Sequence, residues 1–89
     1  MADSLEDLRI RLAAFARARD WEQFHDPKNL SMALIAEAAE LVEHFQWLTP
    51  EQSRALPEQT HREVELEVAD ILIFLIRCTD QLGIDLVRA

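Results

Sequence analysis

The chain has 89 residues, a length that corresponds to one small domain, and domains of this size bury a modest core and often gain stability by association. Its formal net charge of −8 argues against a nucleic-acid-binding surface, which is normally basic, and is compatible with a protein that holds divalent metal. With 49% hydrophobic residues, one glycine, three prolines and no alternating strand pattern, the composition argues against disorder and predicts a small number of long helices.

The first helix is predicted from about Leu5 to about Trp21. Ser4 is an N-cap residue followed three positions later by the acid Asp7, which is a variant of the capping box. Apolar residues recur behind it at helical spacing, and the arginines at positions 9, 11, 17 and 19 are interpreted as a solvated face. This acidic N-terminal region has no apolar signal segment, and the longest apolar run, 71–76, is too short to span a bilayer, so we expect a cytoplasmic protein without membrane contact.

Two aromatic residues and an imidazole mark the break after this helix. Trp21, Phe24 and His25 lie close together in the sequence, and Asp26 precedes a proline, which favours extended geometry and predicts that the helix has ended. A loop of this kind can clamp a flat ligand. Its aromatic residues can equally close the end of the core, and the residues alone leave both interpretations open.

The second helix is predicted from Asn29, as its N-cap, to about Trp47. On a helical wheel of roughly 100° per residue, the apolar residues from Leu34 to Phe45 form one arc. A polar stripe is predicted on the opposite side, comprising Glu37, Glu40, His44 and Trp47, and Glu37 borders the edge of the core at Leu41, where partial burial is expected. We expect His44 to pair with Glu40. For the two glutamates alone, a solvated surface is the competing interpretation.

The third helix is predicted from Pro57 to about Leu82, just before a glycine, after a connection in which Thr49 or Ser53 caps a short turn. Its centre, 71–76, is apolar in almost every direction, which predicts burial on several sides. Asp70 directly precedes this segment, and an ionised carboxylate there needs a partner. Arg77 is seven residues further on and too distant for easy contact with Asp70, so a metal ion is the favoured partner. Residues 84–87 are expected to begin a further short helix.

Four carboxylates in two pairs are the main functional signal. Glu37 and Glu40 lie three residues apart, as do Glu67 and Asp70, so each pair occupies one face of its helix. If the two helices face each other, four negative charges share one small volume and oppose each other's ionisation unless a cation is present. Oxygen ligands of this kind suit Mg²⁺, with Mn²⁺ as the alternative. The apolar surface left on the helices predicts self-association, with a four-helix bundle formed from helical hairpins.

These residues resemble the all-α nucleoside triphosphate pyrophosphohydrolases of the MazG-like superfamily, and in particular its dCTP pyrophosphatase branch. The similarity is carried by the two acid pairs, by residues 19–25 with Pro27 and Asn29, by the Phe45-Gln46-Trp47 ending and by residues 70–75. It covers about residues 12–86 and implies a single MazG-like domain over 1–89 that lacks the family's final helix. It also implies Mg²⁺-dependent hydrolysis of a (deoxy)nucleoside triphosphate, dCTP or a related or modified nucleotide being favoured, to the monophosphate and pyrophosphate, in nucleotide-pool house-cleaning.

The resemblance also assigns roles to individual residues. It implies that the four acids Glu37, Glu40, Glu67 and Asp70 are the metal ligands and the catalytic residues, with either Glu37 or Glu40 as general base. Trp21, His25 and Trp47 fall on positions that hold the base and sugar, and Phe74 falls where that branch often has a tyrosine near the ligand. Because the family's final helix carries phosphate-facing side chains, we expect a neighbouring subunit, Lys28 or Arg77 to take their place.

The expected partners are a nucleoside triphosphate and further copies of this chain, in a dimer or tetramer, without a nucleic-acid polymer. Two competing interpretations remain at this stage. The chain could be a non-catalytic helical module for dimerisation or nucleotide binding. It could also be a dUTPase-like enzyme or a phosphoribosyl-ATP pyrophosphohydrolase, because these share the arrangement of acid pairs.

Overall fold

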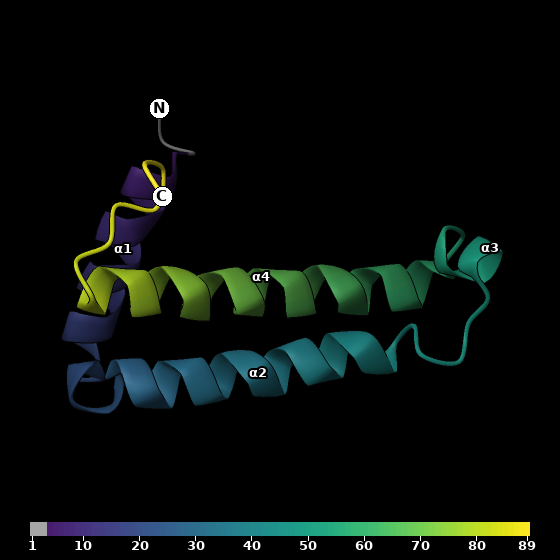
Figure 1. Ribbon diagram of the computed structural model, residues 1–89, viewed down its shortest axis with the longest axis horizontal. Helices are drawn as coiled ribbons and strands as arrows, with labels where there is room; N and C mark the ends of the chain where they lie inside the picture. Colours follow the sequence, from purple (N-terminus) through teal and green to yellow (C-terminus); the bar gives the residue numbers. More distant parts are fainter. Residues whose placement is uncertain (1–3) are drawn as a thin grey trace.

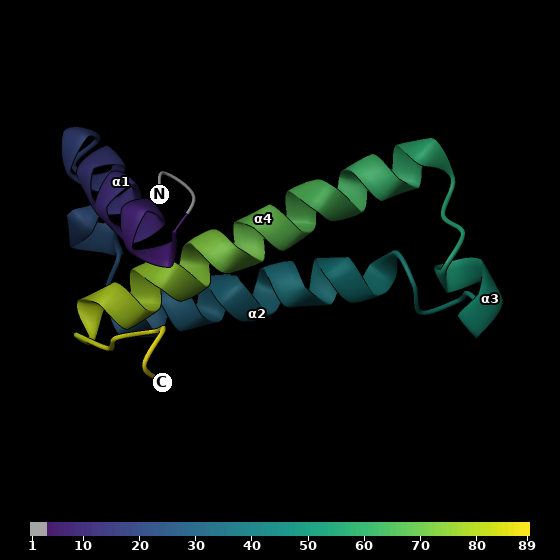
Figure 2. The same cartoon turned by 90° about the horizontal axis from the view of Figure 1, so that it is seen from above.

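The computed structural model describes residues 4–89 and contains helices, turns and loops within that range, with no strand. The elements in chain order are α1 (Leu5–Ala18), the 3-10 turn η1 (Glu22–Phe24), α2 (Pro27–Glu43), α3 (Pro50–Ser53) and α4 (Glu58–Gln81). Helices α2 and α4 lie side by side and antiparallel, and α1 crosses the C-terminal part of α4 (Figures 1 and 2). The all-α prediction and the helical hairpin are therefore confirmed.

Helix α1 ends earlier than predicted because the chain reverses direction at Asp20. Ser4 caps the helix as expected, since its hydroxyl accepts a hydrogen bond of 3.0 Å from the backbone N–H of Asp7. At the other end Asp20 has φ 55, in the left-handed region, and the N–H of Trp21 donates to the carbonyl of Ala16 over 2.9 Å. Trp21 is thus returned towards α1 instead of extending it.

Helix α2 begins and ends at residues other than those predicted. Its N-cap is Asp26 and not Asn29: the Asp26 carboxylate accepts from the Asn29 N–H at 2.8 Å, and Pro27 occupies the first turn. Proline suits that position because its ring presets φ and no N–H is lost there. The helix ends at Glu43, and the segment that leads to Trp47 continues in turns.

The remaining boundaries agree more closely with expectation. Thr49 and Gln52 form a complete capping box at α3. Gly83 has φ 67 beyond the end of α4, where the N–H of Ile84 donates to the carbonyl of Thr79 over 2.9 Å, a helix-terminating arrangement that favours glycine. The predicted further helix over 84–87 is wrong, since this segment forms turns.

The face of α2 that packs on α4 differs only in part from the wheel prediction. Leu30 is buried, and Glu37 is half-buried, which agrees with its predicted place at the edge of the core. His44, predicted on the polar stripe, is also half-buried and shares the inner face. Ile35 from the predicted apolar arc is 67% exposed instead. On α4, Ile76 is buried, but Leu72, Ile73 and Leu75 remain partly exposed, so the segment is not covered on all sides in one chain. Among residues 4–89 no helix combines the length and apolar character needed to cross a membrane.

Removing the N-cap of α2 should weaken the fold without changing its topology. Asp26→Ala is expected to lower the free energy of unfolding by about 1 kcal/mol, because the N–H of Asn29 loses its acceptor at the start of the helix. Urea denaturation followed by circular dichroism measures this change. Asp26→Asn serves as the control because asparagine is an equally good cap, and an equal loss in both variants would contradict the capping role.

Candidate metal and nucleotide site

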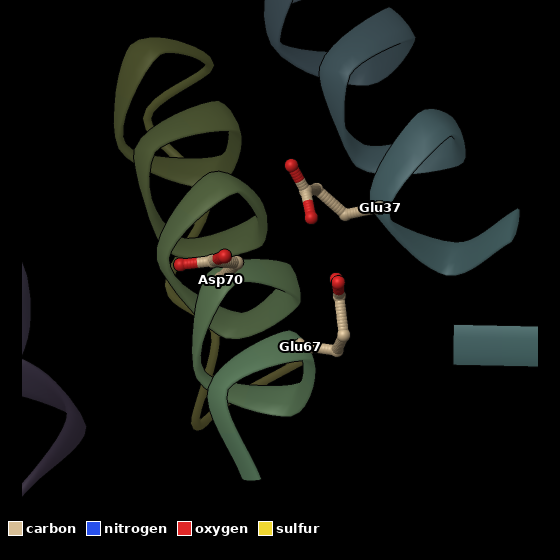
Figure 3. Close-up of side chains that lie close together, drawn as sticks. All are labelled: Glu37, Glu67 and Asp70. Atoms are coloured by element: carbon tan, nitrogen blue, oxygen red, sulfur yellow. The ribbon is translucent and has the colours of Figure 1, made fainter. Parts of the chain in front are cut away.

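The antiparallel arrangement of α2 and α4 brings carboxylates from both helices to one point. One oxygen from each of Glu37, Glu67 and Asp70 lies within 4.8 Å of the others. Glu37 extends from α2 towards α4, Glu67 extends from α4 towards Glu37, and the Asp70 carboxylate lies against α4 one turn further along (Figure 3). Three of the four predicted acids therefore converge, although Glu37 on α2 is 30 or more positions away from the other two in the sequence.

The electrostatics of Glu67 show that this convergence is unfavourable for ionised groups. Contact with the carboxyl of Glu37, burial, and the nearby carboxyl of Glu40 raise the pKa of Glu67 to about 7. Its Oε2 atom is buried and has no hydrogen-bond partner. A buried acceptor without a donor is costly, and a bound cation would satisfy it.

Glu40 occupies the rim of this cluster. It is exposed on α2, one turn after Glu37, and lies outside the group of three oxygens. Its influence on the pKa of Glu67 nevertheless places it close to that side chain. The geometry thus separates three tightly grouped carboxylates from a fourth that is freer to contact solvent.

The grouped oxygens fit a small divalent cation. In octahedral Mg²⁺ coordination the ligand oxygens of one ion are about 3 to 4 Å apart, because each lies at about 2.1 Å from the metal. The 4.8 Å limit that contains the three carboxylate oxygens needs only a small contraction to reach this spacing. Carboxylates are also the ligand type that hard cations such as Mg²⁺ and Mn²⁺ prefer.

A cavity of about 410 Å³ lies between α1, α4 and the loop that follows α1. Its walls are mainly apolar and include Phe15, Trp21, His25, Ile73 and Arg77. The rings of Trp21 and Phe15 meet edge to face at 5.5 Å, and the Trp21 and His25 rings are 6.1 Å apart. Trp21 and His25 therefore line a cavity, whereas Phe24 is 60% exposed and is not among the residues that line it, so the expectation that the aromatic residues close the end of the core is not supported.

The cavity and the acid cluster share one stripe of α4. Ile73 and Arg77 lie three and seven residues after Asp70, which corresponds to roughly one and two helical turns or about 5 and 10 Å along the axis. An elongated ligand can therefore contact the acids with one end and the cavity with the other.

The other predicted ligand-binding residues are not gathered at this place in one chain. Trp47 is 85% exposed beyond the far end of α2, which at 17 residues is about 25 Å long, whereas Trp21 precedes its near end. Lys28 is exposed in the first turn of α2. Phe74 is half-buried on α4, four residues after Asp70 and outside the residues that line the cavity. The expected His44 pairing with Glu40 is wrong, since His44 faces Glu63 at 3.8 Å.

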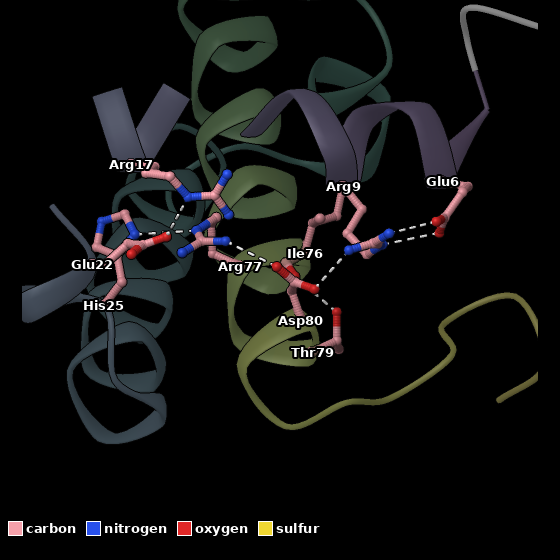
Figure 4. Close-up of polar contacts among 9 residues, drawn as sticks. All are labelled: Glu6, Arg9, Arg17, Glu22, His25, Ile76, Arg77, Thr79 and Asp80. Atoms are coloured by element: carbon pink, nitrogen blue, oxygen red, sulfur yellow. Dashed lines mark hydrogen bonds and ion pairs between the residues drawn. The ribbon is translucent and has the colours of Figure 1, made fainter. Parts of the chain in front are cut away.

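Sequence reasoning missed a second polar cluster at the crossing of α1 and α4 (Figure 4). Arg77 is 2% exposed, and it contacts Asp80 at 3.0 Å and His25 at 3.2 Å. Arg9 was assigned to a solvated face, but it pairs with Asp80 at 3.0 Å across the two helices. The only local signal was the i,i+3 spacing of Arg77 and Asp80, because the other two partners are distant in sequence.

Comparisons with known proteins agree with this fold and site. Mouse dCTP pyrophosphatase 1 is 41% identical over 88 residues, which is 97% of this chain and 52% of the mouse protein. Human dCTP pyrophosphatase 1 is 40% identical over 85 residues, which is 93% of this chain and 50% of the human protein. The chain thus spans about half the length of the curated relatives it matches. No family model matches the chain.

A crystal structure of a pyrophosphatase from Archaeoglobus fulgidus superimposes with a TM-score of 0.86 at 37% identity, covering 93% of this chain and 78% of that one. The hairpin with inward-facing carboxylates is therefore an all-α pyrophosphatase scaffold. The chain belongs to the MazG-like all-α pyrophosphohydrolase superfamily, as its sequence predicted, and its similarity to dCTP pyrophosphatase 1 agrees with the branch that the sequence resembles.

The raised pKa of Glu67 predicts a pH-dependent stability in the absence of divalent cations. The folded-state value of about 7 exceeds the unfolded value of about 4.3, so the contribution of Glu67 is complete below about pH 4.3 and is lost as the pH rises through about 7. Thermal unfolding with a chelator, from pH 5 to pH 8 in buffer steps of about one unit, should show this loss. Added Mg²⁺ should restore the midpoint above pH 7, since binding to the folded state stabilises it.

Glu67→Gln is the test variant, and Glu43→Gln, at the exposed last residue of α2, is the matched control. The difference in unfolding midpoint between wild type and Glu67→Gln should vary with pH, whereas the control should show the same midpoints as wild type. Equal Mg²⁺ stabilisation in all three proteins would contradict the assigned site.

Proposed function

We propose that this chain forms the catalytic site of a Mg²⁺-dependent nucleoside triphosphate pyrophosphohydrolase. The reaction is the hydrolysis of a deoxynucleoside triphosphate, dCTP or a related or modified nucleotide being favoured, to the monophosphate and pyrophosphate. The observation that carries the proposal is the group of three carboxylates within 4.8 Å together with an aromatic-lined cavity on the same stripe of α4. The dCTP pyrophosphatases among its relatives support the choice of substrate.

Glu37, Glu67 and Asp70 would hold the cation, and Glu40 would complete its surroundings from the rim. When bound, the cation supplies charge neutralisation for the phosphate oxygens and acidifies a bound water. The oxygen of water attacks the α-phosphorus, the bond from that phosphorus to the bridging oxygen breaks, and pyrophosphate departs. We assign the general base to Glu40, because it lies outside the tight group and remains free to accept the proton from water.

The nucleoside would occupy the cavity at the other end of the stripe. Trp21 offers a ring against which a base can pack, and His25 lies 6.1 Å from that ring. The roughly 10 Å between Asp70 and Arg77 along α4 is a separation that the sugar and the first phosphate can span. Of the residues considered for the phosphates, Arg77 is already engaged with Asp80, which leaves Lys28 as the more accessible cation.

We propose further that the active form contains two or more copies of this chain. Only three hydrophobic residues among those described are fully buried, and α2 carries an exposed apolar stripe that includes Met32, Ile35 and Val42. These residues follow a spacing of three and seven, which is typical of a helix that packs against another. A second hairpin on this face would create a four-helix bundle and bring the distant Trp47 to the partner's cavity. A physiological role in removing surplus or modified nucleotides from the pool would follow from this activity.

Loss of one metal-binding carboxylate should abolish turnover but not folding. Asp70→Asn is expected to lower Mg²⁺-dependent pyrophosphate release by at least about 100-fold, because it removes a charge from the cation's ligand set. Pyrophosphate release from dCTP, dUTP, dATP, dGTP and modified cytidine nucleotides, with Mg²⁺ and with a chelator, measures activity and preference together. Circular dichroism reports whether the helices persist, and Glu43→Gln provides the control. Nucleotide binding by wild type without turnover would instead identify a non-catalytic module.

A complementation experiment tests whether Trp47 acts on a neighbouring subunit. Trp21→Ala and Trp47→Ala should each raise the KM for the nucleotide. If one site takes Trp21 from one chain and Trp47 from its partner, mixing the two variants after exchange of subunits restores one intact site in each heterodimer. Random mixing then predicts about a quarter of the wild-type site number. No recovery on mixing, with exchange verified by mass spectrometry, would contradict a shared site.

A further inference from the structure

Arg77 is held in an unusual environment for a guanidinium. It is the one charged side chain classed as buried among residues 4–89, with 2% exposure. Its Nη1 donates to the Oδ2 of Asp80 over 3.0 Å, and its Nε donates to the Nδ1 of His25 over 3.2 Å (Figure 4). The Oδ1 of Asp80 accepts a further bond of 3.0 Å from Arg9. These contacts join α1, α4 and the loop before α2 at one wall of the cavity.

The stability of the fold alone does not account for this arrangement. The Nη2 atom of Arg77 is buried without a hydrogen-bond partner, which carries a desolvation cost. Replacing a buried ion pair with apolar residues of similar volume is often neutral or stabilising. Asp80 would also keep a partner without Arg77, because Arg9 bonds its other oxygen. A buried arginine at this place is better explained by what it does to its neighbour.

The effect of Arg77 on His25 follows from proton chemistry. A guanidinium in a protein does not lose its proton, so at the Nδ1 of His25 it can only donate. That ring nitrogen must therefore be unprotonated, and the proton of a neutral imidazole resides on Nε2. Burial and the charge of Arg77 both lower the pKa of His25. Further charged groups near this ring are Arg11 from α1, which lines the same cavity, the Arg17–Glu22 pair at 3.5 Å, and Arg19, which lies over the Phe15 and Trp21 rings.

We propose that Arg77, anchored by Asp80, is a positioning residue that fixes His25 as a neutral donor with its proton on Nε2. This inference rests on the proposed function for the identity of the ligand. A neutral N–H is suited to an uncharged acceptor of the nucleoside, on the base or the sugar, whereas a phosphate oxygen would favour a cation. Arg77 therefore contributes to recognition of the nucleoside through His25 without contacting the ligand itself.

The tautomer of His25 is directly measurable. Long-range ¹H–¹⁵N correlation spectra of protein labelled at histidine distinguish the two neutral tautomers, and His25→Gln assigns the signal. Wild type should show the proton on Nε2 at pH 7.5, with a pKa of His25 below the ordinary value for histidine. In Arg77→Met the two tautomers should mix and the pKa should rise towards the ordinary value. Asp80→Asn, which leaves Arg77 in place, should produce a smaller change in the same direction.

Arg9→Met is the matched control. It also removes an arginine that bonds to Asp80, but it leaves the bond from Arg77 to His25 intact. It should leave the His25 signals as in wild type. An Nδ1–H or protonated His25 in wild type, or unchanged signals in both Arg77→Met and Asp80→Asn, would overturn the proposal.

Ligand binding and kinetics test the role of Arg77 and His25 in recognition of the nucleoside. A non-hydrolysable dCTP analogue should shift the His25 Nε2–H signal in wild type. Arg77→Met should raise the KM for dCTP about tenfold with a smaller change in kcat, as expected for the loss of one oriented hydrogen bond. Absence of turnover in wild type with the expected His25 signals would reject the pyrophosphohydrolase assignment and support the positioning role. A bound analogue that leaves the His25 signal unmoved would overturn the donor role.

Discussion

Mutual repulsion of carboxylates held between α2 and α4 is the constraint on which the rest of the structure depends. The two helices pack against each other, and their contact brings Glu37 close to Glu67 and Asp70. The fold thereby accepts an arrangement that raises the pKa of Glu67 to about 7 and leaves one of its oxygens without a partner. Such a cost is typical of functional sites, where a ligand supplies the missing interaction. A divalent cation is the species that these oxygen ligands suit.

The two ends of the candidate site differ in whether their charges are compensated within the protein. The acid cluster gathers like charges that need a cation, whereas the cluster around Arg77 supplies its own counter-ion in Asp80. The acid cluster is therefore suited to reversible binding of a cation, and the cluster around Arg77 is suited to a permanent orientation of His25. Both lie along α4, so this helix sets the spacing between the acid cluster and the cluster around Arg77. This division agrees with a substrate that has phosphates at one end and a flat ring at the other.

Local spacing predicted much of this architecture. Two acid pairs three residues apart, separated by a connection that must reverse the chain, were sufficient to infer a hairpin with facing carboxylates, and the structure brings three of the four together. The helix ends were less predictable where two good signals competed. Asp26 and Asn29 are both suitable N-caps, and Pro27 between them decides for the earlier one.

The remaining differences arise from tertiary packing. The helical wheel placed His44 on the polar side of α2 and Ile35 in the apolar arc, yet His44 is half-buried and Ile35 is 67% exposed. A helix with two apolar faces has no unique inner side until its partners are known. The bond between Arg9 and Asp80 joins residues 71 positions apart, and the contact of Arg77 with His25 spans 52 positions. Helical spacing carries no information about such contacts.

Anomalous diffraction from crystals soaked in Mn²⁺ tests the central claim most directly, because it locates the cation without relying on activity. The account predicts one or more peaks between α2 and α4, within coordination distance of Glu37, Glu67 and Asp70, that disappear in Glu67→Gln crystals. Mn²⁺ bound only at other surface carboxylates, with the three side chains empty or turned to solvent, would contradict it.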